Sequence, residues 1–222
     1  MGWEENKSKI IKDYQQQYQK FGVNSSSLFI PGRKQNVRYN IIKDIGITAN
    51  DSVLDIGCGF GDLFTFLQQT ISYKGKYTGF DITPEFIDVS KGRFPQTDFR
   101  IFDILSDETD EKWDYVVLTG TLNIKTDELH LDFIKKMVSK MFHFAKKGVS
   151  FDLISISGDD RYDYIFRADP LEIYNFCKLL TQRITLRNDY MPYEFTVYLL
   201  KDESITSDNI YNGYNFPEII KY

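Results

Sequence analysis

Apolar residues recur every three or four positions through the first part of the chain, a spacing typical of amphipathic helices. One such helix is predicted over residues 7–21, where Ile10, Tyr14 and Tyr18 share a face. A second helix is predicted over residues 33–46, where a terminal glycine is a common stop signal. The connection between them ends on a Pro-Gly pair and is predicted to be a loop.

From residue 52 onward, short apolar runs alternate with helical patterns. Strands are predicted at residues 52–56, 76–81, 98–102, 114–120 and 149–155. Helices are predicted at residues 60–71, 83–94, 128–147 and 169–180. The second of these has Thr83 as its N-cap and Pro84 in its first turn, which are favoured residues at those positions. Alternating strands and helices of this kind form a parallel sheet with helices on both faces.

The last third of the chain departs from this alternation. Two β-favouring runs at residues 183–187 and 194–201 are joined by a short connection, which predicts a hairpin and an antiparallel strand at the sheet edge. The polar tail after them is assigned no structure. We therefore divide the chain into an N-terminal helical cap over residues 1–50, a main domain over residues 51–201 and a C-terminal tail over residues 202–222.

Composition narrows the class of protein. A chain of 222 residues suits one globular domain, and its formal net charge of -5 argues against the basic face of a nucleic-acid-binding protein. The two cysteines, Cys58 and Cys177, form neither a disulfide framework nor, with His130 and His143, a zinc site. The N-terminus lacks an apolar signal segment, and no apolar run approaches the roughly 20 residues needed to span a bilayer. We expect a cytoplasmic protein without a metal or a membrane partner.

The candidate chemistry begins at the stretch VLDIGCGFGDLF, which starts at Val53. Glycines at the end of a buried strand are costly unless the backbone turns sharply or a ligand approaches closely. In open α/β sheets, ligands bind beyond the carboxyl ends of the strands. The G-x-G-x-G spacing differs from the G-x-G-x-x-G fingerprint of dinucleotide sites, and Asp62 at the helix start would repel a pyrophosphate. A ligand with a cationic amino group and a ribose suits the acidic surroundings better.

Two further acids follow the next two strands. Asp81 ends the second strand, where an acid usually accepts hydrogen bonds from ribose hydroxyls. Asp103 follows the third strand and could accept a hydrogen bond from the exocyclic amine of adenine. The apolar neighbours of these acids would hold the base between them: Phe80, Ile82, Phe102 and Ile104.

The segments LDIGCGFG and FDIL, together with Asp81, resemble the class I S-adenosylmethionine-dependent methyltransferases over about residues 52–200. The resemblance implies a Rossmann-like, seven-stranded and mostly parallel sheet of order 3-2-1-4-5-7-6, with the last strand antiparallel. It also implies S-adenosylmethionine as cofactor and S-adenosylhomocysteine as product. The family's glycine loop passes under the methionine part, its second acid binds both ribose hydroxyls and its third contacts the adenine amine. These roles fall here on Gly57 and Gly59, on Asp81 and on Asp103.

A finer resemblance concerns RKQNVRYNII, YTGFDITPEFI, LTGTLN and NDYMPYEFTVYL, which are similar to segments of a group of bacterial methyltransferases of largely unassigned substrate. Members often have Asn at the position of Asp152, and many have His at the position of Asn188. By this analogy the product is a methylated sugar or phosphate-type group for bacterial surface, or capsular, polysaccharide biosynthesis. In the family an N-terminal segment commonly closes over the site, so the cap is expected to be a lid.

Several acceptor signatures are missing. LTGTLN stands where adenine and glutamine N-methyltransferases have an Asn/Asp-Pro-Pro-aromatic tetrad, and there is no Pro-Cys or Thr-Cys dyad and no magnesium-binding carboxylate set. Methyl transfer needs positioning and water exclusion, and a neutral oxygen acceptor also needs a base. The missing signatures favour an oxygen of a small polar molecule as the methyl acceptor. The alternatives are N-methylation of a small amine, an RNA or protein acceptor, and a non-catalytic sensor that binds S-adenosylmethionine.

The candidate site residues come from the loops at the carboxyl edge and from the cap. Arg38 is expected to bind the methionine carboxylate, with Gln35 on the same helical face; its alternative is a surface salt bridge. The full cofactor set is Arg38, Gln35, Asp55, Gly57, Gly59, Asp81, Ile82, Asp103, Ile104 and Thr119. The catalytic candidates are Asp152, Asn123 and His130, although Asn123 could instead cap a turn and His130 could be a packed histidine. The substrate candidates are Tyr14, Tyr18, Asn123, Arg161 and Tyr190, in a protein that is a monomer or a homodimer.

Overall fold

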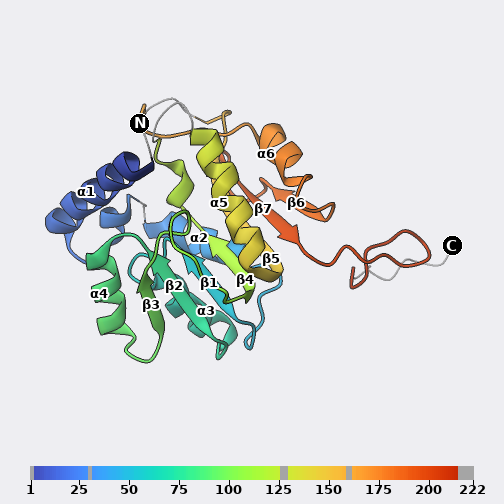
Figure 1. The fold of residues 1–222 in the computed structure, drawn as a ribbon, viewed down its shortest axis with the longest axis horizontal. Coiled ribbons are helices and arrows are strands. Elements are labelled where there is room, and N and C mark those ends of the chain that lie inside the picture. Colours follow the sequence, from blue (N-terminus) through green and yellow to red (C-terminus); the bar gives the residue numbers. More distant parts are fainter. Residues whose placement is uncertain (1–2, 30–31, 126–129, 159–161, 215–222) are drawn as a thin grey trace.

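The computed structural model describes residues 3–29, 32–125, 130–158 and 162–214. Within these ranges a central sheet is surrounded by helices (Figure 1). The strands are β1 (Val53–Ile56), β2 (Tyr77–Asp81), β3 (Asp98–Ile101), β4 (Trp113–Leu118), β5 (Ala145–Ile154), β6 (Ile184–Arg187) and β7 (Glu194–Leu200). The α-helices are α1 (Trp3–Phe21), α2 (Gly32–Lys43), α3 (Asp62–Ile71), α4 (Pro84–Arg93), α5 (His130–Phe144) and α6 (Pro170–Cys177). Two 3₁₀-helices complete the described structure, η1 (Ser25–Leu28) and η2 (Thr121–Asn123).

The strand order is β3-β2-β1-β4-β5-β7-β6 in one seven-stranded sheet. Strands β1 to β5 run parallel to one another, whereas β7 runs antiparallel to both β5 and β6. The predicted order and the predicted reversed last strand are confirmed. Because β1, β2 and β4 run in one direction, their carboxyl ends meet at the same edge of the sheet.

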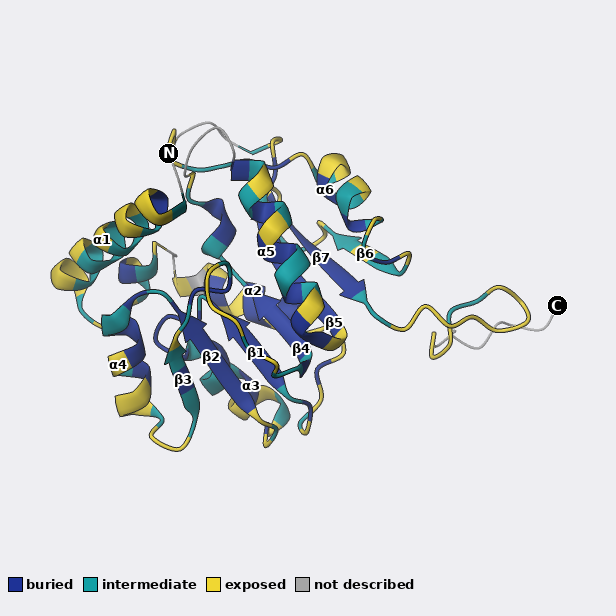
Figure 2. Ribbon diagram, viewed as in Figure 1, coloured by how far each residue is buried: buried dark blue, intermediate teal, exposed yellow. Residues whose placement is uncertain are grey.

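The central strands are buried on both faces, as parallel strands covered by helices must be. All residues of β1 and β2 are buried, which explains their nearly continuous apolar sequences. One face of the sheet packs against α5 and α6, and the opposite face packs against α2 and α3. Figure 2 shows the strands as the buried centre and the outward faces of the helices as the exposed surface.

The predicted helix over residues 128–147 is wrong at its end, since α5 stops at Phe144 and β5 begins at Ala145. Residues 128 and 129 lie outside the described residues. Ala145 pairs with Trp113 of β4, so sheet pairing overrides the local preference of this segment for helix. The first helix begins at Trp3, four residues earlier than predicted, and this added turn contributes to the site below. The predicted loop between the two N-terminal helices contains η1, where the Asn24 side chain accepts a hydrogen bond from the Ser26 backbone N–H.

No helix within the described ranges has the length and apolar character needed to cross a bilayer.

Replacing Trp113 with alanine should lower the free energy of unfolding by about 3 to 5 kcal/mol. The indole is fully buried, its Nε1 donates a 3.0 Å hydrogen bond to Thr78 Oγ1, and its ring packs edge-on against Phe80 and Phe144. Urea denaturation measures the change. Leu179→Ala is the control, because that side chain is 82% exposed and its loss should cost less than about 0.5 kcal/mol. Equal losses in both variants would contradict this description of the core.

Candidate active site

The glycine turn after β1 is held against β2 by backbone hydrogen bonds. The N–H groups of Gly57 and Cys58 both donate to the carbonyl oxygen of Phe80, at 2.8 and 3.0 Å. Gly57 has a φ of +70°, and a Cβ there would lie 2.2 Å from Thr121 Oγ1. Glycine is therefore required because the backbone adopts a left-handed conformation and the chain after β4 approaches closely.

A cavity of about 1050 Å³, including its open mouth, lies beyond this turn. Its walls come from the ends of β1, β2 and β4, the segment after β3, and α1. The walls are mostly apolar but contain three carboxyl groups, those of Asp55, Asp81 and Asp103. Large apolar clefts with a few polar groups are the usual sites for small ligands. The other predicted cofactor residues among its lining are Gln35, Gly57, Gly59, Ile82, Ile104 and Thr119.

Asp81 joins the loops that follow β1 and β2. Its Oδ2 accepts the backbone N–H of Gly59 at 3.0 Å, and its Oδ1 accepts that of Thr83 at 2.8 Å. Burial raises the pKa of this carboxyl above its ordinary value even though the two N–H groups favour the charged form. The carboxylate thus fixes the shape of the turn while facing the cavity.

Asp55 is 2% exposed and accepts a 2.5 Å hydrogen bond from the hydroxyl of Tyr77. Burial raises the pKa of Asp55 to about 7, and the nearby charges of Asp81 and Asp62 act in the same direction. A cation bound in the cavity would favour the ionised form of this group. The site is therefore suited to a positively charged ligand.

Asp103 is bound by the first turns of α1. Its Oδ2 accepts hydrogen bonds from Trp3 Nε1 at 2.8 Å and from Ser106 Oγ at 3.0 Å, and it lies 2.9 Å from Lys7 Nζ. Burial alone would raise the pKa of Asp103, but the bonds from Lys7 and Trp3 outweigh it and hold the pKa below its ordinary value. The other carboxylate oxygen, Oδ1, accepts the Leu105 backbone N–H at 2.9 Å, and the predicted contact of Asp103 with an adenine amine stays a prediction. The predicted helix over residues 7–21 left out Trp3, and the position of Lys7 in its first turn gave no sign of a contact with Asp103.

The apolar neighbours of these acids all line the cavity, so their predicted contact with the base stays a prediction. Phe80 and Phe102 stack on each other with ring centroids 4.1 Å apart. Tyr14 lines the cavity and packs edge-on against Phe86, whereas Tyr18 packs against Phe60 and Phe86 outside the cavity lining. The rings of α1 therefore attach the helix to the glycine turn and to α4.

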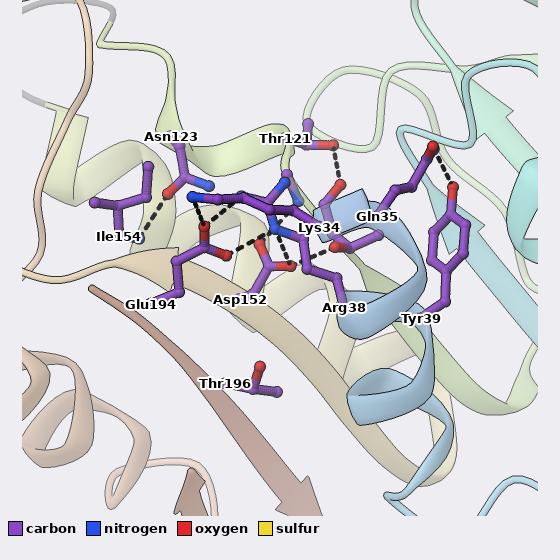
Figure 3. Close-up of polar contacts among 12 residues, drawn as sticks. Lys34, Gln35, Arg38, Tyr39, Thr121, Asn123, Asp152, Ile154, Glu194 and Thr196 are labelled. Atoms are coloured by element: carbon purple, nitrogen blue, oxygen red, sulfur yellow. Dashed lines mark hydrogen bonds and ion pairs between the residues drawn. The ribbon is translucent and has the colours of Figure 1, made fainter. Parts of the chain in front are cut away.

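Arg38 lies behind the cavity wall in a buried ionic cluster (Figure 3). Its Nε and Nη2 donate to the two carboxylate oxygens of Glu194 at 2.7 and 2.9 Å, and its Nε lies 3.9 Å from Asp152 Oδ2. Lys34 Nζ is 3.6 Å from the same Glu194 carboxylate. Arg38 is not among the residues that line the cavity, so its predicted contact with the methionine carboxylate stays a prediction.

Asp152 is linked to the cavity wall through Thr119 and Gly120. The Thr119 hydroxyl and the Gly120 backbone N–H, the latter at 2.8 Å, donate to its two carboxylate oxygens. Burial raises the pKa of Asp152; Arg38 opposes this shift and the negative charge of Glu194 adds to it. Gln35 lines the cavity, and its Nε2 donates a 2.5 Å bond to the hydroxyl of Tyr39.

The remaining candidates within the described ranges lie outside the cavity lining. Asn123 Oδ1 accepts the Ile154 backbone N–H at 2.9 Å, which matches the alternative role of a structural cap. His130 is 1% exposed, with its Nε2 2.8 Å from the Leu122 carbonyl oxygen. The Tyr190 hydroxyl is 2.7 Å from Thr196 Oγ1. Arg161 lies outside the described residues. Among the residues that are described, no group of three His, Cys, Asp or Glu side chains could hold a metal ion.

Residues 47–188 match the family model for a methyltransferase domain. A Mycobacterium tuberculosis protein named as a methyltransferase is 29% identical over 156 residues, covering 68% of this chain and 93% of that protein. The fold is similar to magnesium protoporphyrin IX methyltransferase from Synechocystis PCC 6803 with bound S-adenosylhomocysteine. The TM-score is 0.62 at 16% identity, over 87% of this chain and 95% of that chain. A structure of the same enzyme with S-adenosylmethionine gives a TM-score of 0.60, at 16% identity over 88% of this chain and 96% of that chain.

Asp81→Ala should weaken the binding of S-adenosylmethionine about 100-fold, because it removes a hydroxyl acceptor and the group that shapes the turn. Isothermal titration calorimetry measures the affinity, and circular dichroism verifies the fold. Asp88→Ala is the matched control, since Asp88 is an exposed acid on the neighbouring helix α4. A folded Asp81→Ala protein that binds as tightly as the control would contradict this assignment.

The binding of S-adenosylmethionine should also depend on Asp55 and pH. Below pH 7 the free carboxyl is largely neutral and must release a proton to pair with the cationic ligand, so affinity rises as pH increases through about 7 and then levels off. Calorimetry in buffers of different ionisation enthalpy counts the protons released. Asp55→Asn should release fewer protons than the wild type at pH 6. Identical proton release in both proteins would show that Asp55 keeps its charge state on binding.

Proposed function

The chain belongs to the class I S-adenosylmethionine-dependent methyltransferases, and from this premise we propose that it methylates an oxygen of a small sugar or phosphate-type compound. S-adenosylmethionine is the cofactor of this enzyme and S-adenosylhomocysteine its product. In the proposal, Gly57 and Gly59 lie under the methionine part of the cofactor, Asp81 accepts the ribose hydroxyls and Asp55 faces the cationic groups.

The position of α1 is the observation that supports a small acceptor. Trp3, Ile10 and Tyr14 line the cavity, and hydrogen bonds tie the helix to Asp103 near one end and, through Gln15, to Glu85 of α4. A cavity covered in this way favours a small acceptor over a macromolecular one. It also excludes water, which methyl transfer requires so that the reacting groups stay aligned and poorly solvated.

The wall after β4 supplies the polar groups for the reaction. Thr119 lines the cavity, and its hydroxyl donates to the buried Asp152. In the proposed reaction an acceptor hydroxyl oxygen attacks the methyl carbon, and the bond from that carbon to sulfur breaks. The hydroxyl proton passes to Thr119 Oγ1 while the proton of Thr119 passes to Asp152, which becomes neutral. The raised pKa of Asp152 suits it to accept that proton.

The proposal includes use of the methylated product in a bacterial surface polysaccharide. Its support is the similarity of the segments RKQNVRYNII and LTGTLN to the bacterial methyltransferase group described above.

Transfer of a radiolabelled methyl group from S-adenosylmethionine tests the acceptor class. The panel contains neutral sugars, sugar phosphates, nucleotide sugars, small amines, bulk RNA and a protein lysate. We expect label in an alkali-stable O-methyl product of a sugar compound. Label in amines, RNA or protein would refute the proposed acceptor. Absence of transfer by a protein that binds S-adenosylmethionine would favour the sensor alternative.

The Thr119–Asp152 relay predicts a specific pattern of mutant kinetics. Thr119→Val should lower kcat about 100-fold with little change in the affinity for S-adenosylmethionine, because it removes the hydroxyl that carries the proton. Thr119→Ser keeps the hydroxyl and should retain most of the activity. If the valine and serine variants lose equal activity, the hydroxyl does not carry the proton.

A further inference from the structure

A second cavity lies beside the cofactor cavity along α1. It has about 900 Å³ of space including its mouth, and it lies between α1, Phe29 and the segment that follows η2. Ile10 and Ile124 line both cavities, so the two spaces share a wall made of these two apolar side chains. The second cavity, called the groove below, is therefore next to the cofactor cavity, with these two side chains as their common wall.

The wall of this groove opposite α1 is fixed by backbone bonds. Lys125 N–H donates to the Tyr164 carbonyl oxygen at 2.8 Å, and Ile124 forms an antiparallel bridge with Ile165. This brings a residue from the segment after β4 and one from the segment after β5 to the same side of the groove. Both segments follow the carboxyl ends of their strands, where acceptor groups must come to meet the cofactor.

The charges of the groove point to an anionic ligand. Its described lining contains two lysines, Lys9 from α1 and Lys125 from the opposite wall, and one carboxylate, Asp13. The local charge is therefore +1, in a protein whose formal net charge is -5. Cations on two facing walls can bind one anionic group between them by charge-assisted hydrogen bonds.

The other groups of the groove suit a polyhydroxyl compound. Gln16 and Gln17 offer amide donors and acceptors that can pair with hydroxyl groups. Phe29 and Tyr164 add aromatic surface, which lets the apolar face of a small ring pack against the wall. Amides, aromatic rings and paired lysines together match a charged monosaccharide better than a purely apolar molecule or a simple amine.

We propose that this groove binds the anionic end of the methyl acceptor, a monosaccharide that carries a phosphate or a carboxylate. The charged group lies between Lys9 and Lys125, and the sugar extends past Ile10 and Ile124 so that one hydroxyl reaches the methyl group. This inference rests on the proposed function and specifies its acceptor.

The test measures binding of sugars to the full chain saturated with S-adenosylhomocysteine, by calorimetry and ligand-observed NMR. The probes are the 1-phosphates, 6-phosphates and uronates of glucose, galactose and mannose, with the neutral hexoses as reference. We expect an anionic probe to bind at least 10-fold more tightly than its neutral parent. Whether the phosphates or the uronates bind more tightly identifies the anion. If none of the anionic probes exceeds its neutral parent, the inference is wrong.

Variants locate the binding site. The double variant Lys9→Ala/Lys125→Ala should lose the preference for the anionic probe, while Lys12→Ala, an exposed lysine on α1 outside the groove lining, should keep it. An unchanged preference in the double variant would overturn the inference. Methyl transfer to an anionic sugar that the double variant performs as fast as wild type would overturn the groove and leave the proposed function intact. If the wild-type protein binds the anionic probe as expected but transfers methyl groups only to amines, the proposed function is refuted instead.

Discussion

Buried carboxylates at the carboxyl edge of the sheet impose the main constraint on this structure. Asp55, Asp81, Asp103 and Asp152 lie at or near the ends of β1, β2, β3 and β5 and are between 1% and 8% exposed. A buried charge without partners costs several kcal/mol, so each group needs donors or must bind a proton. The chain meets this need differently at each strand: a tyrosine hydroxyl for Asp55, two backbone N–H groups for Asp81, and the first turns of α1 for Asp103. Asp152 accepts hydrogen bonds from the Thr119 hydroxyl and the Gly120 N–H and lies 3.9 Å from Arg38 of α2.

The different partners of these four carboxylates explain how the N-terminal segment is placed over the site. The two acids toward either side of the cavity receive cations from the N-terminal helices, Lys7 for Asp103 and Arg38 for Asp152. The two acids between them, Asp55 and Asp81, receive only neutral donors from the described residues, and burial raises their pKa values, as it raises that of Asp152. A cationic cofactor complements the central pair. The same electrostatic requirement therefore positions the N-terminal helices and leaves room for S-adenosylmethionine.

The sequence predicted the features that depend on residues close to one another along the chain. The glycine turn and Asp81 at the end of β2 follow from spacing and alternation, whereas the strand order came from the family resemblance, and the structure confirms that order. It could not predict contacts between distant segments. Arg38 pairs with Glu194, which is 156 positions away, so its spacing from Gln35 gave no sign of that partner. Trp3 lay before the first clear apolar repeat, so its bond to Asp103 was also missed.

The most direct test of this account is a crystal structure of the complex with S-adenosylhomocysteine. The account predicts ribose hydroxyls within hydrogen-bond distance of Asp81, the amino group on the side of Asp55, and Trp3 and Lys7 still bound to Asp103. A complex in which α1 has left Asp103 and the adenine amine has taken its place would contradict the claim that Asp103 binds the N-terminal helix while Asp55 and Asp81 face the cofactor. A nucleoside bound away from the glycine turn would contradict the whole assignment of the site.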